Sequence, residues 1–378
     1  MTRVVVVGAG PVGLAAALAA ARRGMDVTVA EAGSAGRVRP GSRAVFVHRA
    51  SLEALERIRP GLGADLAAAG ITWSVRRTLW AGRTVYRRSY AVPGAGLPPF
   101  TSLPQSMVEE HLVRACGAAG VRIAWDTRVT GIRSSPAAVA LETRSGPMSA
   151  DRVIAADGPR STVRARLGIR LDGSSPGGDF VVVDVAGTAR SPELERVFHY
   201  RHPGVGGRNV LLVPFRGGHR IDLQCRDEEE AERFAADARP WVEQVLGGHD
   251  ITWVSRYRFR RRVAERFTDR HGRVLLAGEA AHLFPPFGAR GMNSGITDAV
   301  AAAEAVATGD AYGYGAERRR AALANRAAAA AAHEHLAART WKDRARQRGA
   351  ALLAPVSRRA GRWLDSAPFG PPLARVSY

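Results

Sequence analysis

The sequence predicts an α/β fold, in which a Rossmann-like dinucleotide-binding domain carries an inserted, mostly antiparallel β-sheet and is followed by C-terminal helices. The opening residues, 3–31, have the pattern strand, glycine-rich turn, alanine-rich helix, strand. From about residue 178 to 253 the pattern changes to a series of short strands, and the last third of the chain has a helical composition rich in Ala and Arg. A chain of 378 residues also exceeds the size at which one hydrophobic core stops growing, so we expect coupled subdomains.

The first thirty residues have the pattern of a βαβ unit. Val4 to Val7 is a β-branched run typical of a buried strand. Residues 11–23 consist largely of Ala and Leu, which favour helix, and Gly24 ends that helix. Residues 27–30 form the second strand. This opening predicts a parallel sheet covered by helices.

The rest of the chain alternates between helical and strand-like segments. Helices are expected at 50–58, 105–120 and 293–308. Strands are expected within 71–90 and at 121–132, 138–143, 153–155, 180–185, 197–200, 210–214, 220–225 and 274–277. The C-terminal third is predicted to be helical until Pro355, beyond which Pro and Gly predict a tail packed on the surface.

Composition argues against several classes of protein. The net charge is +20, but the basic residues are scattered Arg with Lys342 as the only Lys, and no aromatic-interleaved stripe or DNA-reading motif accompanies them. We therefore interpret the charge as a solvated basic surface that can attract anionic ligands, and not as a nucleic-acid interface. Two distant cysteines argue against a disulfide framework or a Cys-based zinc site, and they fit a reducing cytoplasm. We see no signal peptide and no apolar run of about 20 residues, so a cytoplasmic protein without a transmembrane segment is expected.

The glycine-rich turn carries a dinucleotide fingerprint. Its sequence, Gly8-Ala9-Gly10-Pro11-Val12-Gly13, is a G-x-G-x-x-G that follows a strand and opens a helix. Gly8 allows the tight turn, Gly10 lets the backbone approach a pyrophosphate, and Gly13 permits close packing of the helix on the sheet. Glu31 ends the next strand, where it would accept hydrogen bonds from ribose hydroxyls.

Two later motifs narrow the choice of dinucleotide cofactor. The first runs from Ala156-Asp157-Gly158-Pro159-Arg160-Ser161 to Arg164, and the second runs from Arg273 through Gly278-Glu279 and His282 to Asp298. Together with the fingerprint, in this order and over about three quarters of the chain, they resemble the motifs of FAD-dependent aromatic hydroxylases of the p-hydroxybenzoate hydroxylase type. Segments 41–44, 51–73, 210–212, 220–224 and 287–295 are similar to the branch containing 3-(3-hydroxyphenyl)propionate hydroxylases.

The resemblance implies FAD as cofactor. By this resemblance, Arg43 and Gln105 contact FAD from the loop and helix after the second strand, Val129 meets the adenine end, Asp157 touches the flavin side, and Glu279 binds the ribityl chain. The complete set of expected FAD-binding residues is Gly8, Gly10, Pro11, Val12, Gly13, Glu31, Arg43, Gln105, Val129, Asp157, Gly278, Glu279, Pro286, Gly291, Met292 and Asn293. Glu279 departs from the family, which usually has Asp there, so its reach is one methylene longer.

The resemblance also implies a division of the chain. The expected FAD-binding domain comprises 1–75, 104–175 and 263–310, the last on the flavin side. A substrate-domain segment is expected at 76–103, the substrate-binding β-sheet domain at 176–262 and a C-terminal helical region at 311–378.

The activity implied is hydroxylation of a phenol-like, aromatic or polyketide-like substrate. NADH or NADPH binds transiently and reduces FAD, and O2 then forms a flavin C4a-hydroperoxide that transfers oxygen. The catalytic base stays open among weak candidates in segments near the predicted sheet, namely His48, His199, Tyr200, His202 and Asp222. No metal is expected, and the protein is expected to be a monomer or homodimer.

Other chemistries remain open at this stage. The same scaffold can perform epoxidation, N-hydroxylation or Baeyer-Villiger insertion on a natural-product intermediate. A halogenase is excluded, because its active-site Lys and Trp-x-Trp-x-Ile-Pro segment do not occur. The alternatives from another class are a non-catalytic flavin-binding protein and a basic nucleic-acid-binding protein.

Overall fold

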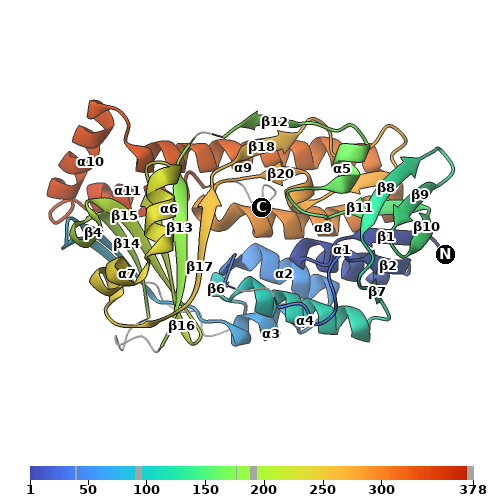
Figure 1. Cartoon of the computed structure of the whole chain (residues 1–378), viewed down its shortest axis with the longest axis horizontal. Coiled ribbons are helices and arrows are strands. Elements are labelled where there is room, and N and C mark those ends of the chain that lie inside the picture. The colour runs from blue at the N-terminus through green and yellow to red at the C-terminus, as the bar shows by residue number, and fades with distance from the viewer. Residues whose placement is uncertain (39–40, 90–95, 176, 188–193, 373–378) are drawn as a thin grey trace.

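The structure, a computed structural model, describes residues 1–38, 41–89, 96–175, 177–187 and 194–372. A five-stranded parallel sheet with the order β19-β11-β1-β2-β7 forms the cofactor half. Its strands are β1 (Arg3–Val7), β2 (Asp26–Ala30), β7 (Arg122–Ala124), β11 (Arg152–Ala155) and β19 (Val274–Leu276). The predicted parallel sheet is confirmed, and Figure 1 shows it at the end of the molecule that holds the N-terminus.

Helix α1 (Pro11–Arg22) packs against α8 (Arg290–Thr308) and α4 (Gln105–Ala118). The alanines of α1 make this possible, since small side chains let helices approach closely; Ala15, Ala16, Ala17, Ala19 and Ala20 are all fully buried. The buried run Val4 to Val7 fills the other side of the same core. The predicted βαβ opening therefore forms because its strand is β-branched and its helix is lined with small residues.

A seven-stranded sheet, here called the substrate sheet, has the order β17-β13-β16-β15-β14-β4-β5. Its strands are β4 (Val75–Trp80), β5 (Arg83–Ser89), β13 (Asp179–Ala186), β14 (Glu195–His202), β15 (Arg208–Phe215), β16 (Gly218–Cys225) and β17 (Asp250–Arg258). Every neighbouring pair is antiparallel except β14 and β4. The expectation of a mostly antiparallel inserted sheet is confirmed.

Side-chain alternation gives the substrate sheet two different faces. One face is covered by α6 (Glu228–Ala236) and α7 (Arg239–Leu246), two helices that the sequence patterns did not predict. Val181, Val183, Ile221 and Leu223 point toward these helices. Phe180, Val182, Phe198 and Tyr200 point the other way and pack with Phe287 and the C-terminal helices. We call this second side the inner face.

The C-terminal helices cross from the cofactor half to the substrate sheet (Figure 1). They are α9 (Ala311–Ala337), α10 (Trp341–Leu353) and α11 (Arg358–Ser366), followed by the 3-10 turn η4 (Ala367–Phe369). The expected surface tail after Pro355 is wrong: Pro355 lies in a turn, Ser357 caps α11, and Leu364 and Asp365 are buried. Pro355 ends one helix without preventing the next, because the new helix starts two residues later at a Ser cap.

The remaining elements connect these layers. They are β3 (Phe46–His48), α2 (Arg49–Ile58), α3 (Leu62–Ala69), β6 (Phe100–Ser102), β8 (Val129–Ser134), β9 (Val139–Thr143), β10 (Gly146–Ala150), α5 (Thr162–Arg166), β12 (Leu171–Ser174), η1 (Pro203–Val205), β18 (Arg261–Ala264), η2 (Gly278–Ala280), β20 (His282–Leu283) and η3 (Phe287–Ala289). The end of the strand-like segment at position 90 and the last residues of the C-terminal region, 373–378, lie outside the described residues. Within the described residues, no helix has the length and apolarity to cross a membrane.

Candidate functional site

The glycine turn between β1 and α1 can pack this tightly only because it lacks side chains. Gly8 has a φ of +102°, and a Cβ there would lie 2.5 Å from the carbonyl oxygen of Ala156. A Cβ on Gly13 would overlap the carbonyl oxygen of Gly8. Helix α1 begins immediately after Gly10, with Pro11 at its first position. The turn and the positive helix end thus form the cradle that a pyrophosphate requires.

Glu31 is held beside this cradle at the end of β2. Its carboxylate accepts hydrogen bonds from the backbone N–H groups of Ala9, at 2.6 Å, and Gly33, at 2.9 Å. The Arg37 guanidinium lies 3.5 Å from the same carboxylate. The Glu31 carbonyl oxygen accepts from the Thr127 N–H, two residues before Val129. Glu31 and Val129 therefore lie at the same end of the cradle, as the adenosine-binding roles require.

Asp157 follows β11 and organises the start of α5. Its oxygens accept hydrogen bonds from the Ser161 hydroxyl, at 2.5 Å, and the Val163 N–H, at 3.0 Å. Burial raises the pKa of Asp157, against the lowering effect of these hydrogen bonds. Arg164, in the same short helix, donates to the Ala280 carbonyl oxygen at 3.0 Å. The Asp157 motif and the Gly278–Ala280 turn are therefore fixed to each other.

Glu279 is exposed to solvent but stands among charged neighbours. Desolvation raises its pKa, against the opposing charges of His282, Arg43 and Arg260. We infer from this combination that Glu279 faces a concave part of the surface, here called the recess. The preceding Gly278 has a φ of +60° and packs against Val12, so the turn that presents Glu279 fits against α1.

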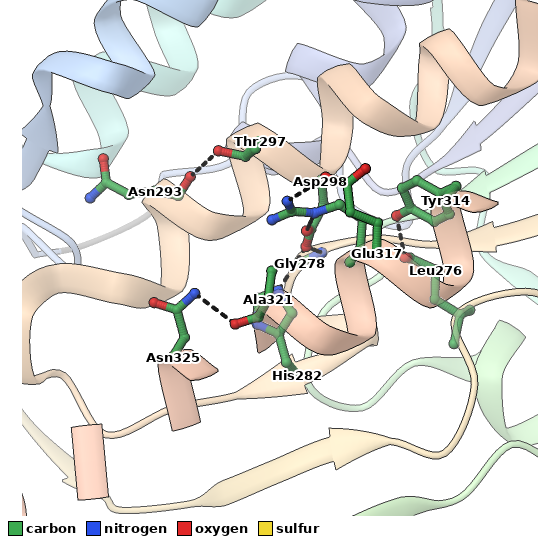
Figure 2. A network of polar contacts seen from close by, with 11 residues as sticks. Leu276, Gly278, His282, Asn293, Thr297, Asp298, Tyr314, Glu317, Ala321 and Asn325 are labelled. Carbon is green, nitrogen blue, oxygen red and sulfur yellow. Dashed lines mark hydrogen bonds and ion pairs between the residues drawn. The ribbon is translucent and has the colours of Figure 1, made fainter. Parts of the chain in front are cut away.

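A buried network behind this turn keeps it in place (Figure 2). Asp298 of α8 accepts hydrogen bonds from the Gly278 N–H, at 3.0 Å, and from His282 Nε2 and Arg318 Nε, each at 2.7 Å. Although burial alone would raise it, the Arg318 and His282 partners lower the pKa of Asp298 to about 2. The Tyr314 hydroxyl donates to the Leu276 carbonyl oxygen, also at 2.7 Å. This network anchors the turn from the side away from the recess.

The loop that carries Arg43 is fastened to the substrate sheet. The Ser42 N–H and hydroxyl both donate to the Asp184 carboxylate of β13, at 2.5 and 2.7 Å. The Ser42 carbonyl oxygen accepts from the Gln105 N–H at the start of α4, at 2.9 Å. Arg43 itself is exposed, with a φ of +51°, and its charge acts on Glu279. Arg43, Gln105 and Glu279 are thereby gathered around one recess.

The segment that opens α8 presents its backbone to the same region. Asn293 donates to the Phe46 and Ala289 carbonyl oxygens, at 2.8 and 2.7 Å, and accepts from the His48 N–H and the Ser51 hydroxyl. Its side chain is thus engaged within the protein and fixes the loop before α8 to β3 and α2. A Cβ on Gly291 would meet no heavy atom within 4 Å, so this residue faces open space. Pro286 is the N-cap residue of η3, and Met292 follows Gly291 in α8.

The structure separates the candidate bases. His48 Nε2 lies 3.0 Å from the Gly288 carbonyl oxygen, beside the α8 loop, and burial lowers its pKa to about 4. Asp222 lies on the inner face, where its carboxylate accepts from Arg220 Nε at 2.6 Å. Tyr200, also on the inner face, donates to the Leu364 carbonyl oxygen and lies 2.9 Å from His335 Nε2, and burial raises its pKa well above the usual value. These bonds make Tyr200 a connection to α9 and α11.

His199 and His202 lie away from the recess. His199 pairs with Val210, whose side chain packs under α6 and α7, and its Nε2 accepts from the Gly82 N–H at 2.9 Å. The His202 ring lies 4.2 Å from that of His199. Alternation along β14 therefore directs His199 toward the opposite face from Tyr200.

Several residues of the recess were not found by sequence reasoning. Trp253 of β17 packs over Gly41, and the Tyr257 hydroxyl donates to the Phe284 carbonyl oxygen at 2.9 Å. Asp184 binds Ser42 across 142 residues of sequence. No local sequence pattern predicts these contacts, because they depend on how the substrate sheet packs against the cofactor half.

The cradle and the fixed turn define the site of a dinucleotide-binding protein, and known proteins identify the dinucleotide. Residues 1–334 match the FAD binding domain family, so the chain belongs to this family. FAD is its cofactor, and the tight turn at Gly8 and Gly13, which leads directly into the N-terminus of α1, fits a pyrophosphate group. Within the described residues, no group of His, Cys, Asp and Glu is suited to hold a metal ion.

Its relatives include aromatic hydroxylases and monooxygenases, as the sequence motifs predicted, and also a protein named dialkyldecalin synthase from Streptomyces rugosporus. The chain is 33% identical to 6-methylpretetramide 4-monooxygenase of Streptomyces rimosus, over 79% of this chain and 54% of that protein. It is 36% identical to a 3-(3-hydroxy-phenyl)propionate/3-hydroxycinnamic acid hydroxylase of Burkholderia cenocepacia, over 45% of this chain and 32% of that protein. The crystal structure of p-nitrophenol 4-monooxygenase from Pseudomonas putida superposes with a TM-score of 0.78 and 26% identity, over 99% of this chain and 100% of that one.

The lengths differ among these proteins. The chain spans 54% to 65% of the first four curated relatives, but all of the p-nitrophenol 4-monooxygenase chain.

Proposed function

We propose that the protein is an FAD-dependent monooxygenase that hydroxylates a phenolic or related aromatic ring with NAD(P)H and O2. The observation that carries the proposal is the junction between the cofactor loops and the inner face of the substrate sheet. The Ser42–Asp184 and Tyr257–Phe284 hydrogen bonds join the two halves there, and the charge of Glu279 acts on Tyr257. A ring enclosed there lies against the cofactor and away from water.

The expected FAD contacts divide between its two ends. Gly8, Gly10 and Gly13 hold the pyrophosphate, Glu31 and Val129 face the adenosine, and Asp157, Glu279 and the start of α8 face the flavin. The chemistry that bound FAD supplies is hydride acceptance from NAD(P)H and activation of O2. One oxygen atom enters the ring as a hydroxyl, and the other leaves as water with two electrons from NAD(P)H and one further proton.

The chain's own residues orient the ring and handle its proton. His48 is neutral at pH 7, since its pKa is about 4, and its Nε2 donates to Gly288. Of the candidate bases it is the one beside the α8 loop, so we propose that it contacts the substrate. Asp222 and Arg220, on the inner face, are proposed to orient polar groups of the ring.

The relatives of this chain are named for substrates of different size. The names of the relatives include a nitrophenol, a hydroxyphenylpropionate and 6-methylpretetramide as compounds on which they act. We propose a phenol as the common element, because an electron-rich ring accepts oxygen most readily. Epoxidation, N-hydroxylation or Baeyer-Villiger insertion is the rival chemistry, and a flavin- or nucleic-acid-binding protein without turnover is the rival class.

The deciding experiment is an NAD(P)H-oxidation screen over phenols. A substrate should accelerate oxidation, and hydroxylated product should account for most of the NAD(P)H consumed, with little H2O2. Non-phenolic analogues of equal size serve as controls. Productive oxygenation of an aliphatic ligand alone favours the rival chemistry, and bound FAD without stimulated oxidation contradicts enzyme function. Light scattering on the same samples tests the expected monomer or homodimer.

A further inference from the structure

Two segments far apart in the sequence meet behind the loop that opens α8. Arg290, the first residue of α8, is 1% exposed. Its Nη2 donates to the carbonyl oxygens of Phe369 and Pro371, both at 3.0 Å, and its Nη1 donates to Asn325 Oδ1 at 3.2 Å. A buried guanidinium is costly unless its donors find acceptors, so the position of Arg290 depends on the C-terminal segment.

The same C-terminal segment also packs closely against the loop that opens α8. Gly288 has a φ of +74°, and a Cβ there would lie 2.6 Å from the Phe369 carbonyl oxygen. On its other side, the Gly288 carbonyl oxygen accepts from His48 Nε2. The loop Phe287–Arg290 is therefore held between His48 and the C-terminal segment, with no room for movement toward Phe369.

The Phe369 side chain extends this connection to the substrate sheet. Its ring lies 4.5 Å from the Arg76 guanidinium of β4 and 4.2 Å from the Arg196 guanidinium of β14. Asp365 of α11 accepts from Arg76 Nε at 3.1 Å and from the Thr78 hydroxyl at 3.3 Å. One short segment thus contacts the loop through its backbone and the substrate sheet through its ring.

We propose that the segment Ala367–Pro371 is a positioning element of the flavin site, and that Arg290 is the positioning residue through which it acts. Arg290 fixes the first turn of α8, whose backbone N–H groups have no partners within the helix and face the cofactor. The segment thereby sets the α8 loop relative to the substrate sheet. FAD affinity tests this role directly, whereas its consequence for catalysis rests on the proposed function.

The main experiment measures FAD binding to apo-protein by quenching of flavin fluorescence. Arg290→Met and Phe369→Ala should each weaken binding by roughly tenfold or more, the usual loss when a buried charge-assisted hydrogen bond or its support is removed. Arg290→Lys should recover part of the affinity, because an ammonium group can still bind one of the carbonyl oxygens. Arg359→Met and Val356→Ala change exposed side chains of the same C-terminal region and should bind FAD like the unchanged protein.

Far-UV circular dichroism of each apo-protein distinguishes loss of positioning from loss of folding. If Arg290→Met does not fold, Phe369→Ala tests the proposal instead, because this variant keeps the backbone carbonyl and removes only the ring. Folded Phe369→Ala or Arg290→Met with unchanged FAD affinity and an unchanged visible flavin spectrum overturns the proposal.

The second readout is the fraction of NAD(P)H oxidation that is coupled to hydroxylation. At saturating FAD, the two variants should oxidise NAD(P)H with less hydroxylated product and more H2O2 than the controls. If the unchanged protein hydroxylates no phenol, the proposed function fails while the binding measurement still decides on the positioning element. If it does and the variants keep full coupling, the segment has no part in aligning the two halves.

Discussion

Two buried carboxylates in different halves of the molecule have opposite pKa shifts. Asp298, in the cofactor half, is fully buried, yet its pKa falls to about 2 because Arg318 and His282 outweigh the effect of burial. Asp184, on the inner face of the substrate sheet, is 3% exposed, and its pKa is raised. Burial dominates there, against the Ser42 hydrogen bonds and the charge of Arg220, while the charge of Asp222 adds to the increase.

The difference lies in which carboxylate each guanidinium bonds. Asp298 accepts hydrogen bonds from Arg318 Nε, from His282 Nε2 and from the Gly278 backbone N–H, and the Arg318 guanidinium reaches Glu317 only at 3.6 Å. Arg220 lies between two carboxylates and directs its Nε toward Asp222. The first network is balanced and anchors the cofactor turn, whereas the second leaves excess negative charge at the wall of the recess. We therefore expect changes to the first to reduce stability and changes to the second to alter ligand binding.

Arg318→Met is predicted to have the largest effect. It leaves Asp298 buried without its guanidinium, and breaking one partner of a buried pair costs about 3–5 kcal/mol. The free energy of unfolding of the apo-protein, measured with urea, should fall by this amount, and FAD should bind more weakly because Gly278 loses its anchor. Arg319→Met, a change to the next residue, serves as control. A loss below about 1 kcal/mol contradicts the anchoring role.

Acid should weaken the substrate half before the cofactor half. Burial lowers the pKa values of His48, His199, His333 and His335 to about 4 from 6.5. Between these values the unfolded chain binds protons that the folded chain does not, so stability falls as pH falls from 6.5 to 4. Each such proton costs up to about 1.4 kcal/mol per pH unit.

These histidines lie around the substrate sheet, α9 and the α8 loop, whereas Asp298 keeps its charge until the pH nears 2. Hydrogen exchange at pH 5 compared with pH 7 should therefore show β14 and α9 losing protection before β1 and β11. Equal loss in the two halves at pH 5 is the result that contradicts this order.

The same contrast explains what the sequence could predict. The turn at Gly8 and Gly13 is a local feature, since its backbone shape is set within one βαβ unit, and it was predicted correctly. The parallel and antiparallel sheets followed from periodicity. Contacts such as Ser42–Asp184 and Arg290–Phe369 join residues 142 and 79 positions apart, and no short-range signal marks them. His199 was a candidate because its segment was expected near the substrate sheet, but only the register of β14 reveals that it lies on the face opposite to Tyr200.

Glu279 lies between the two networks, and its replacement should affect FAD binding more than folding. Glu279→Ala should weaken FAD binding by about 1–3 kcal/mol, the usual loss for a hydrogen bond to a charged group. Glu279→Asp, which restores the residue usual in related hydroxylases, should be tolerated. Fluorescence titration of the apo-protein measures both. Unchanged affinity of Glu279→Ala rules out the ribityl-binding role.

Asp222→Asn is predicted to have the smallest effect on stability. The amide oxygen of Asn can still accept the hydrogen bond from Arg220 Nε, which is 2.6 Å in the present pair. The change also removes a like charge beside Asp184, so the pKa of Asp184 should fall and Arg220 should pair with Asp184 alone. The weaker hydrogen bond to Arg220 and the removed repulsion beside Asp184 nearly cancel. We therefore expect the free energy of unfolding at pH 7 to change by less than about 1 kcal/mol.

The double variant Asp184→Asn with Asp222→Asn leaves Arg220 buried without a carboxylate. It should therefore lose more stability than the sum of the losses in the two single variants. The contrast between the two halves is wrong if Asp222→Asn alone lowers the free energy of unfolding as much as Arg318→Met. In that case the Arg220 guanidinium depends on Asp222 in the same way as Arg318 depends on Asp298.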